Sequence, residues 1–177
     1  MPRRLAQHFL ATVLGALGFA LLSGCAAGPK LNEVYAVPPG AEPGLARIYF
    51  YRPLDAFLIA RDTEFVINGQ RVGEAVSGAV FFRDARPGRY SIHTVDDDAS
   101  VIYLSLVTGD VAYVRAQSQL GSLGYGIGAV LVTPAVGRAE AAGLVLTDGR
   151  AHEAEDETPK APLTALRPPE ERCCDAR

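Results

Sequence analysis

The sequence predicts a mostly β fold: a small antiparallel β-sandwich or open barrel with one short C-terminal helix, preceded by a signal-peptide helix. Three observations support this. Short aromatic and β-branched runs recur at regular spacing between residues 45 and 147, and turn-forming pairs separate them. Residues 148–177 are acidic, contain proline and lack apolar periodicity. The 177 residues therefore suffice for one domain with tails.

The first half of the domain has the clearest local signals. The aromatic run 45–51 is typical of a strand, and Pro53 blocks its continuation in a central ladder. The pair Asn68-Gly69 supplies the positive φ angles of a type I′ turn. We therefore expect a hairpin with strands at 63–67 and 70–74.

Four further strands are expected along the chain. Residues 79–84 form one strand, which ends at the Pro-Gly turn 86–89. Residues 89–95 alternate between apolar and polar side chains and predict a half-buried strand. Residues 100–107 are apolar on both faces, which predicts a central strand, and residues 111–115 follow as the next one.

The C-terminal part of the domain is more varied. Glycines crowd residues 117–132, which predicts a flexible loop or a close backbone contact, with an oligomer contact through 121–132 as one use. Thr133-Pro134 is a typical helix start, and a short helix at 135–142 is expected. Residues 144–146 add a last strand.

The N-terminus carries a targeting signal. Arg3 and Arg4 precede an apolar run from Phe9 to Leu22, a pattern typical of a secretory signal. The run ends in Leu22-Ser23-Gly24-Cys25, which resembles the lipobox of bacterial lipoproteins. The resemblance implies cleavage before Cys25 and acylation of that cysteine, for example with palmitate. An uncleaved transmembrane helix is the alternative for this segment.

These signals divide the chain into four parts: a lipoprotein signal peptide at 1–24, a flexible tether at 25–44, a β-sandwich domain at 45–147 and a disordered tail at 148–177. The tether prediction depends on its prolines and glycines. Ala26 follows the cysteine where aspartate is the familiar inner-membrane retention signal. The resemblance therefore implies a lipid-anchored protein of the bacterial cell envelope, at the outer membrane and facing the periplasm or the surface.

The core also resembles domain-of-unknown-function family 2846, a group of small bacterial envelope proteins. The matching pieces span residues 45–116, with a weaker match at Gly137-Arg138-Ala139-Glu140. Some pieces also look like PEGA-type β-sandwich repeats. The resemblance implies a β-rich lipoprotein domain and supplies no catalytic residues. The matching pieces are Tyr51-Arg52-Pro53, the hairpin from Val66 to Gly73, Pro87-Gly88-Arg89-Tyr90 and the strand from Gly109 to Val114.

Two groups of residues are candidates for a site. Arg83, Arg86 and Arg89 cluster near the Pro-Gly turn and are suited to an anionic sugar or lipid phosphate, although they also suit a solvated sheet edge. His93 with Asp96 to Asp98 could hold a divalent metal such as calcium, or form an ordinary solvated turn.

Composition limits the function classes. The formal net charge is −3 and becomes more negative once the signal is removed, so no nucleic-acid partner is expected. Adjacent Cys173 and Cys174 are too close for an ordinary disulfide between them. We expect no cofactor and a non-enzymatic binding or assembly module with envelope proteins or glycans as partners. The alternative is an envelope hydrolase or metal-dependent enzyme that uses His93 and the Asp96 to Asp98 loop.

Overall fold

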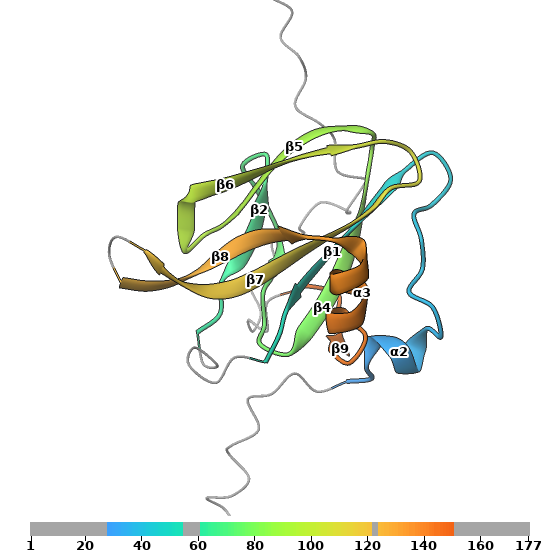
Figure 1. Cartoon of the computed structure of the whole chain (residues 1–177), viewed down its shortest axis with the longest axis horizontal. Helices are drawn as coiled ribbons and strands as arrows, with labels where there is room; N and C mark the ends of the chain where they lie inside the picture. The colour runs from blue at the N-terminus through green and yellow to red at the C-terminus, as the bar shows by residue number, and fades with distance from the viewer. Residues whose placement is uncertain (1–27, 55–60, 122–123, 151–177) are drawn as a thin grey trace, which may run out of the picture.

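The protein folds into two β-sheets that pack face to face, with its helices on one outer side (Figure 1). The computed structural model describes residues 28–54, 61–121 and 124–150. The first sheet has the order β8-β7-β1-β4-β9, and the second sheet has the order β3-β2-β5-β6. The predicted fold class is confirmed. The elements are α2 Leu31–Val34, β1 Ala46–Arg52, β2 Glu64–Ile67, β3 Gln70–Glu74, β4 Ala79–Ala85, β5 Gly88–Thr94, β6 Asp97–Leu106, β7 Val111–Gly121, β8 Gly124–Val132, α3 Pro134–Ala141 and β9 Val145–Leu146.

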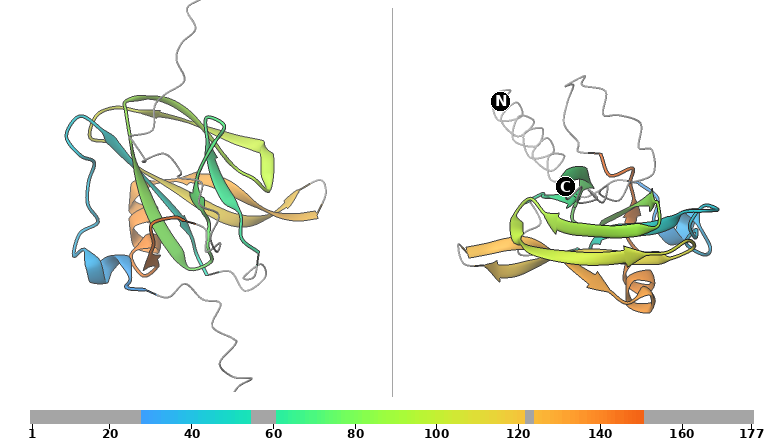
Figure 2. Two further views of the ribbon diagram at one scale, coloured as in Figure 1. Left: turned by 180° about the vertical axis from the view of Figure 1, so that it is seen from behind. Right: turned by 90° about the horizontal axis from the view of Figure 1, so that it is seen from above.

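Alternation along the strands creates two apolar clusters. Phe50, Phe65 and Phe81 meet between the sheets, with ring centroids 4.9 to 6.1 Å apart. Successive strand side chains point to opposite faces, so Tyr49 and Tyr51 lie on the outer side of the first sheet. A second cluster forms there with α2 and α3. In the right-hand view of Figure 2, α3 protrudes below the stacked strands.

The first sheet is mixed rather than purely antiparallel. β1 pairs antiparallel with β4 but parallel with β7, and β9 adds parallel to β4. A parallel pair requires a long crossover connection, and here the whole second sheet lies between β1 and β7 in the chain. The confirmed fold class therefore contains two pairings that local sequence patterns did not indicate.

The predicted hairpin is confirmed. β2 and β3 pair antiparallel around Asn68 and Gly69, whose φ angles are 49° and 78°. The Asn68 side-chain carbonyl also accepts a 2.9 Å hydrogen bond from the backbone N–H of Ser91 in β5. The turn residue thus ties the hairpin to the next strand of the second sheet.

The prediction that residues 100–107 form a central strand is wrong. This segment belongs to β6, which is the edge strand of the second sheet. Tyr103 points away from the core and is 81 % exposed. An apolar run on both faces is typical of a buried strand. Here Tyr103 and Val107 face solvent, whereas the inward side chains pack on the core, namely Ile102, Leu104 and Leu106.

The glycine-rich segment is a strand and not a flexible loop. β8 pairs with β7 along its whole length, from Tyr113 opposite Val132 to Gly121 opposite Gly124. The expected close contact is present at Gly128, where a Cβ would overlap the side chain of Gln119. Small residues in β8 leave room for the long side chains of β7.

The N-terminal strap, as we call residues 28–44, lies against the domain. Leu31 is fully buried in the second apolar cluster, and its N–H donates to the carbonyl of Leu144 over 2.8 Å. Farther along, the carbonyl of Pro39 accepts a 2.6 Å hydrogen bond from the Tyr49 hydroxyl. This docking replaces the flexible tether expected for 25–44 wherever the structure describes it.

The ordered domain also continues past residue 147. The carbonyl of Gly149 accepts a 2.9 Å hydrogen bond from the N–H of Glu74, and the carbonyl of Asp148 accepts one from Arg83. The first residues of the expected disordered tail therefore complete the packing of β3 and β4. The predicted signal peptide at 1–24 and the rest of the predicted tail, 151–177, lie outside the described residues.

Candidate functional site

An open groove of about 440 Å³ lies between the last residues of β6, the start of β7 and the end of β8. Its lining is mainly apolar, and Leu131 remains 43 % exposed beside it. This volume lies within the range of small-ligand sites, about 300–1,000 Å³. The side chains that define the groove are Leu104 and Leu106 from β6, Ala112 from β7, Leu131 from β8, and Thr133 and Pro134 at the start of α3.

The groove results from the edges of the two sheets. β6 ends the second sheet and β8 ends the first. Near the β5–β6 turn the two sheets are joined, because the Thr94 hydroxyl at the end of β5 donates to the carbonyl of Ile127 in β8. Toward the β6–β7 turn the groove opens between Leu104 and Leu131. Alternation turns both of these side chains inward, so the opening exposes apolar surface.

Two polar side chains at the groove, Asp110 and Thr133, already have structural partners. One Asp110 carboxylate oxygen accepts a 2.8 Å hydrogen bond from the N–H of Val107 and closes the turn that contains Gly109 at a φ of 87°. The Thr133 hydroxyl caps α3 by accepting from the N–H of Val136. The groove is therefore suited to apolar contact more than to acid or base chemistry.

A polar cluster joins α3 to the outer face of the first sheet. The Tyr51 hydroxyl donates to Glu140 over 2.6 Å, and Arg115 donates to both oxygens of that carboxylate at 3.0 and 3.1 Å. Arg115 also donates to Gln117 over 2.7 Å. Burial, followed by the hydrogen bond with Glu140, raises the pKa of Tyr51 well above 10. These hydrogen bonds fasten α3 to the outer face of the first sheet.

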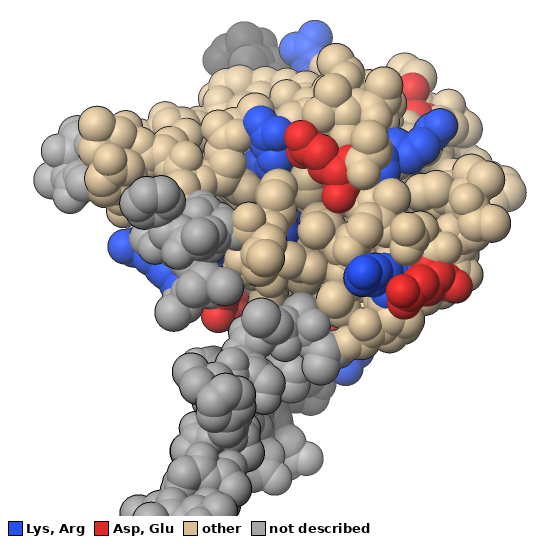
Figure 3. All heavy atoms as spheres, turned by 60° about the horizontal axis from the view of Figure 1, so that its bottom comes forward, with Lys and Arg blue, Asp and Glu red and all other residues tan. Residues whose placement is uncertain are grey.

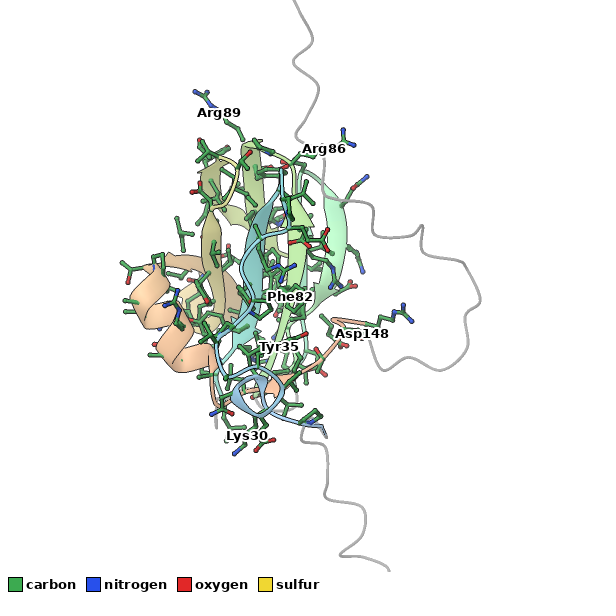
Figure 4. The ribbon with its side chains drawn as sticks, turned by 90° about the vertical axis from the view of Figure 1, so that its right-hand side faces the viewer. Lys30, Tyr35, Phe82, Arg86, Arg89 and Asp148 are labelled. Carbon is green, nitrogen blue, oxygen red and sulfur yellow. The ribbon has the colours of Figure 1, made fainter. Side chains whose placement is uncertain are left out.

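The three candidate arginines do not form one site. Arg83 lies over the Phe81 ring, 4.7 Å from its centroid, and donates to the carbonyls of Val72, Phe82 and Asp148. Arg86 and Arg89 are exposed at the far end of the molecule from Lys30 (Figure 4). A phosphate ligand at the turn would therefore have two of the three guanidinium groups available.

Nearby Asp84 does not neutralise any of these arginines. It pairs with Arg47, which donates to both carboxylate oxygens over 2.8 Å. The Arg47 guanidinium also lies 4.2 Å from the centroid of Phe82. This pair belongs to the outer face of the first sheet, under the N-terminal strap.

The residues expected to hold a metal have separate partners. Asp96 forms a 2.8 Å salt bridge with Arg61, and Asp97 accepts hydrogen bonds from Gln119 and from the N–H of Ser100. Asp98 is exposed. His93 lies in β5 with its Nδ1 2.9 Å from the carbonyl oxygen of Thr94. Over residues 28–54, 61–121 and 124–150, no three His, Cys, Asp or Glu residues converge into a metal-binding group.

The β7–β8 hairpin presents apolar side chains at its outer end. Leu120 and Tyr125 face each other across the two strands and are both exposed. Figure 1 shows this end of the hairpin extending beyond the body of the two sheets. The predicted oligomer contact at 121–132 thus includes one exposed apolar residue at a protruding end, and its role stays a prediction.

Local sequence patterns did not indicate the groove or the Glu140 cluster. The inward side chains Leu104 and Leu106 fit the apolar alternation of an ordinary core strand. Only the pairing of each sheet shows that β6 and β8 are edges. For Glu140, the one available signal was its place in the weak match at 137–140.

The lipidation prediction concerns residues that the structure does not describe. Cys25 lies outside the described ranges, as do Cys173 and Cys174. None of the described helices is long and apolar enough to cross a membrane.

Comparison with known proteins found no match. No family model matches the sequence, no curated protein matches it, and no solved structure matches the fold. The resemblance to domain-of-unknown-function family 2846 therefore stays a prediction based on the motifs quoted above.

Proposed function

We propose that this protein is a lipid-anchored, non-enzymatic binding module of the bacterial cell envelope, held by acylated Cys25. The groove between β6 and β8 takes an extended apolar segment of an envelope protein. The lipobox at residues 22–25 supports the anchor. The groove is the observation that carries the binding function.

The choice of an extended peptide follows from the strands beside the groove. Both β6 and β8 are terminal strands of their sheets. An edge strand presents backbone N–H and C=O groups on its outer side, and an added strand can pair with them. An extended peptide places every second side chain on one face, so it can direct apolar residues toward Leu104 and Leu131.

The alternative function, an enzyme that uses His93 and Asp96 to Asp98, gains nothing from the geometry. Asp96 is occupied by Arg61, and Asp97 by Gln119. The apolar groove is formed by other residues.

The anchor is tested by metabolic labelling with a fatty acid. The wild-type protein should incorporate the label, and Cys25→Ser should lose it because serine lacks the thiol that the resemblance assigns to acylation. Equal labelling of the two proteins would contradict the assignment of Cys25.

The groove is tested by photo-crosslinking in intact cells. A photoreactive amino acid at Pro134, an exposed residue of the groove lining, should form an adduct with a polypeptide, and the adduct should disappear when Leu131→Glu places a charge in the apolar lining. The matched control carries the same group at Tyr103, which lies on β6 but points away from the core.

Mass spectrometry of the adduct decides between occupants. Attachment at an apolar, extended segment of an envelope protein supports the proposal. An adduct of lipid mass, or equal adducts at positions 103 and 134, would contradict it.

A further inference from the structure

The docking of the N-terminal strap fixes which end of the domain meets the membrane. We propose that the end formed by α2, β9 and the last turn of α3 rests on the bilayer surface, while the Arg86 and Arg89 turn points away from it. This inference depends on the acylation of Cys25 proposed above.

The strap is attached to the domain very close to the predicted anchor. The N–H of Leu146 donates to the carbonyl of Pro29 over 2.9 Å, and Lys30 forms a bridge with Val145. Leu31 is bound in the same way to Leu144 and is fully buried. The domain is therefore held from Pro29 onward.

The remaining chain is too short to let the domain turn over. Four peptide steps separate Cys25 from Pro29, and they span at most about 14 Å when fully extended. A domain of this size is about 35 Å across. Since the connection is shorter than the domain, the end that carries Pro29 must stay near the bilayer.

The opposite end must then lie away from the membrane. Figure 4 shows Lys30 at one end of the molecule and Arg86 and Arg89 at the other. The strap returns along the outer face from α2 toward the start of β1, where the N–H of Arg47 donates to Asp110 in the β6–β7 turn. The groove residue Asp110 thus lies toward the end that we place away from the bilayer.

The end that we place at the membrane carries few charges, and these are of both signs. It can therefore rest on a lipid surface without being strongly attracted to it by charge. At this end of the strap Lys30 and Glu33 provide one charge of each sign, and a Glu33 carboxylate oxygen accepts a 2.9 Å hydrogen bond from the backbone N–H of Lys30. Val34 and Val37 are exposed beside them. Figure 3, in which this end comes forward, shows charges of both signs in small groups separated by uncharged surface. The orientation therefore depends on the covalent anchor and the docked strap.

The test measures the distance of two surface positions from lipid headgroups. The full-length, lipidated protein with Cys173→Ser and Cys174→Ser is placed in vesicles of phosphatidylethanolamine and phosphatidylglycerol. A fluorophore is attached at Gly143→Cys, where a new side chain meets no atom within 4 Å. A second protein carries the fluorophore at Arg89→Cys, at the other end.

Headgroup-linked quenchers should quench position 143 several-fold more than position 89, at low and at high salt. Equal quenching, or stronger quenching at position 89, would overturn the orientation. Flotation with the vesicles is measured in parallel. A protein that does not float shows that the anchor proposal has failed, whereas one that floats with the wrong quenching pattern refutes only the orientation.

A second variant tests the role of the strap. Leu31→Asp should release the strap, which lengthens the connection to the 20 steps between Cys25 and Leu45, up to about 65 Å. Quenching at position 143 should then fall toward that at position 89. Circular dichroism checks that the sheets persist, and Leu31→Ala provides a milder change. Unaltered quenching in a folded variant with a protease-sensitive strap would contradict the proposal.

Discussion

At the scale of single residues, the seating of α3 depends on glycine at position 137. A Cβ at this position would overlap the ring of Tyr113, which stacks on Tyr49 with centroids 4.9 Å apart. Gly137→Ala should therefore lower the free energy of unfolding by about 1–3 kcal/mol, although alanine favours a helix by about 1 kcal/mol. Urea unfolding measures the difference.

Gly143→Ala is the matched control for that change. Position 143 follows the same helix, and nothing lies within 4 Å of an added Cβ. It should alter stability by no more than about 0.5 kcal/mol. Equal effects at the two positions would show that the contact with Tyr113 is unimportant.

The buried tyrosines make the free energy of unfolding decrease at alkaline pH. Burial, together with the neighbouring Tyr113, raises the pKa of Tyr49 to about 12, above its ordinary value of 10.0. At a pH between these two pKa values, the Tyr49 hydroxyl is deprotonated in the unfolded chain and protonated in the folded protein. The stabilisation is complete below pH 10 and declines as pH rises toward 12, by about 1.4 kcal/mol per pH unit for one such group.

Tyr49→Phe should make that decline shallower, and adding Tyr51→Phe should make it shallower still because the pKa of Tyr51 is also raised. Urea unfolding at pH 9, 10 and 11 gives the slopes. Identical slopes in the wild-type protein and both variants would be inconsistent with the raised pKa values.

At the scale of elements, the β2–β3 hairpin depends on its turn. Gly69 has a φ of 78°, a left-handed conformation that costs an L-residue about 1–2 kcal/mol. Gly69→Ala should lower the free energy of unfolding by that amount. Gly40→Ala, which meets nothing within 4 Å and does not have a positive φ, should be nearly neutral. Chemical unfolding of both variants checks the prediction, which fails if their stabilities agree.

This hairpin shows which elements the sequence could predict. Its register follows from a two-residue turn, and the helix at 134–141 follows from Thr133 and Pro134, so the information is local. The parallel pairing of β1 with β7 depends on strands far apart in the chain. No turn motif indicates this parallel pairing. The edge position of β6 also depends on pairing between strands, so local patterns could not predict it.

The contrast between local signals and long-range pairing also applies to the candidate site residues. Arg83 and Arg86 are close in sequence, but strand alternation and a turn separate them, and Arg83 is held by distant Val72 and Asp148. Leu104 and Leu131 are far apart in sequence and meet at the groove only because each lies on an edge strand. Proximity in sequence therefore grouped side chains that the fold separates, and it gave no sign of the two that the fold brings together.

At the scale of the whole molecule, the N-terminal strap is a structural part of the domain. Leu31 fills a place among Tyr49, Tyr51 and Tyr113, and Pro39 accepts the Tyr49 hydroxyl hydrogen bond. A leucine side chain contributes about 1.5–3 kcal/mol when it is buried. Removing the strap would also expose the aromatic rings beneath it.

We therefore expect two fragments to behave differently. Residues 28–150 should fold and remain monomeric at micromolar concentration, whereas residues 45–150, the boundary suggested by composition, should melt at a lower temperature and self-associate through the uncovered tyrosines. Thermal denaturation and size-exclusion chromatography measure both properties. The fragment 28–150 with Leu31→Ala should fall between them, because it keeps the hydrogen bonds of the strap and loses most of its apolar contact. Equal melting temperatures for the two fragments would mean that the strap only rests on the sheet. The chain from Cys25 to Leu45 would then be a flexible tether, and the proposed orientation on the membrane would lose its physical basis.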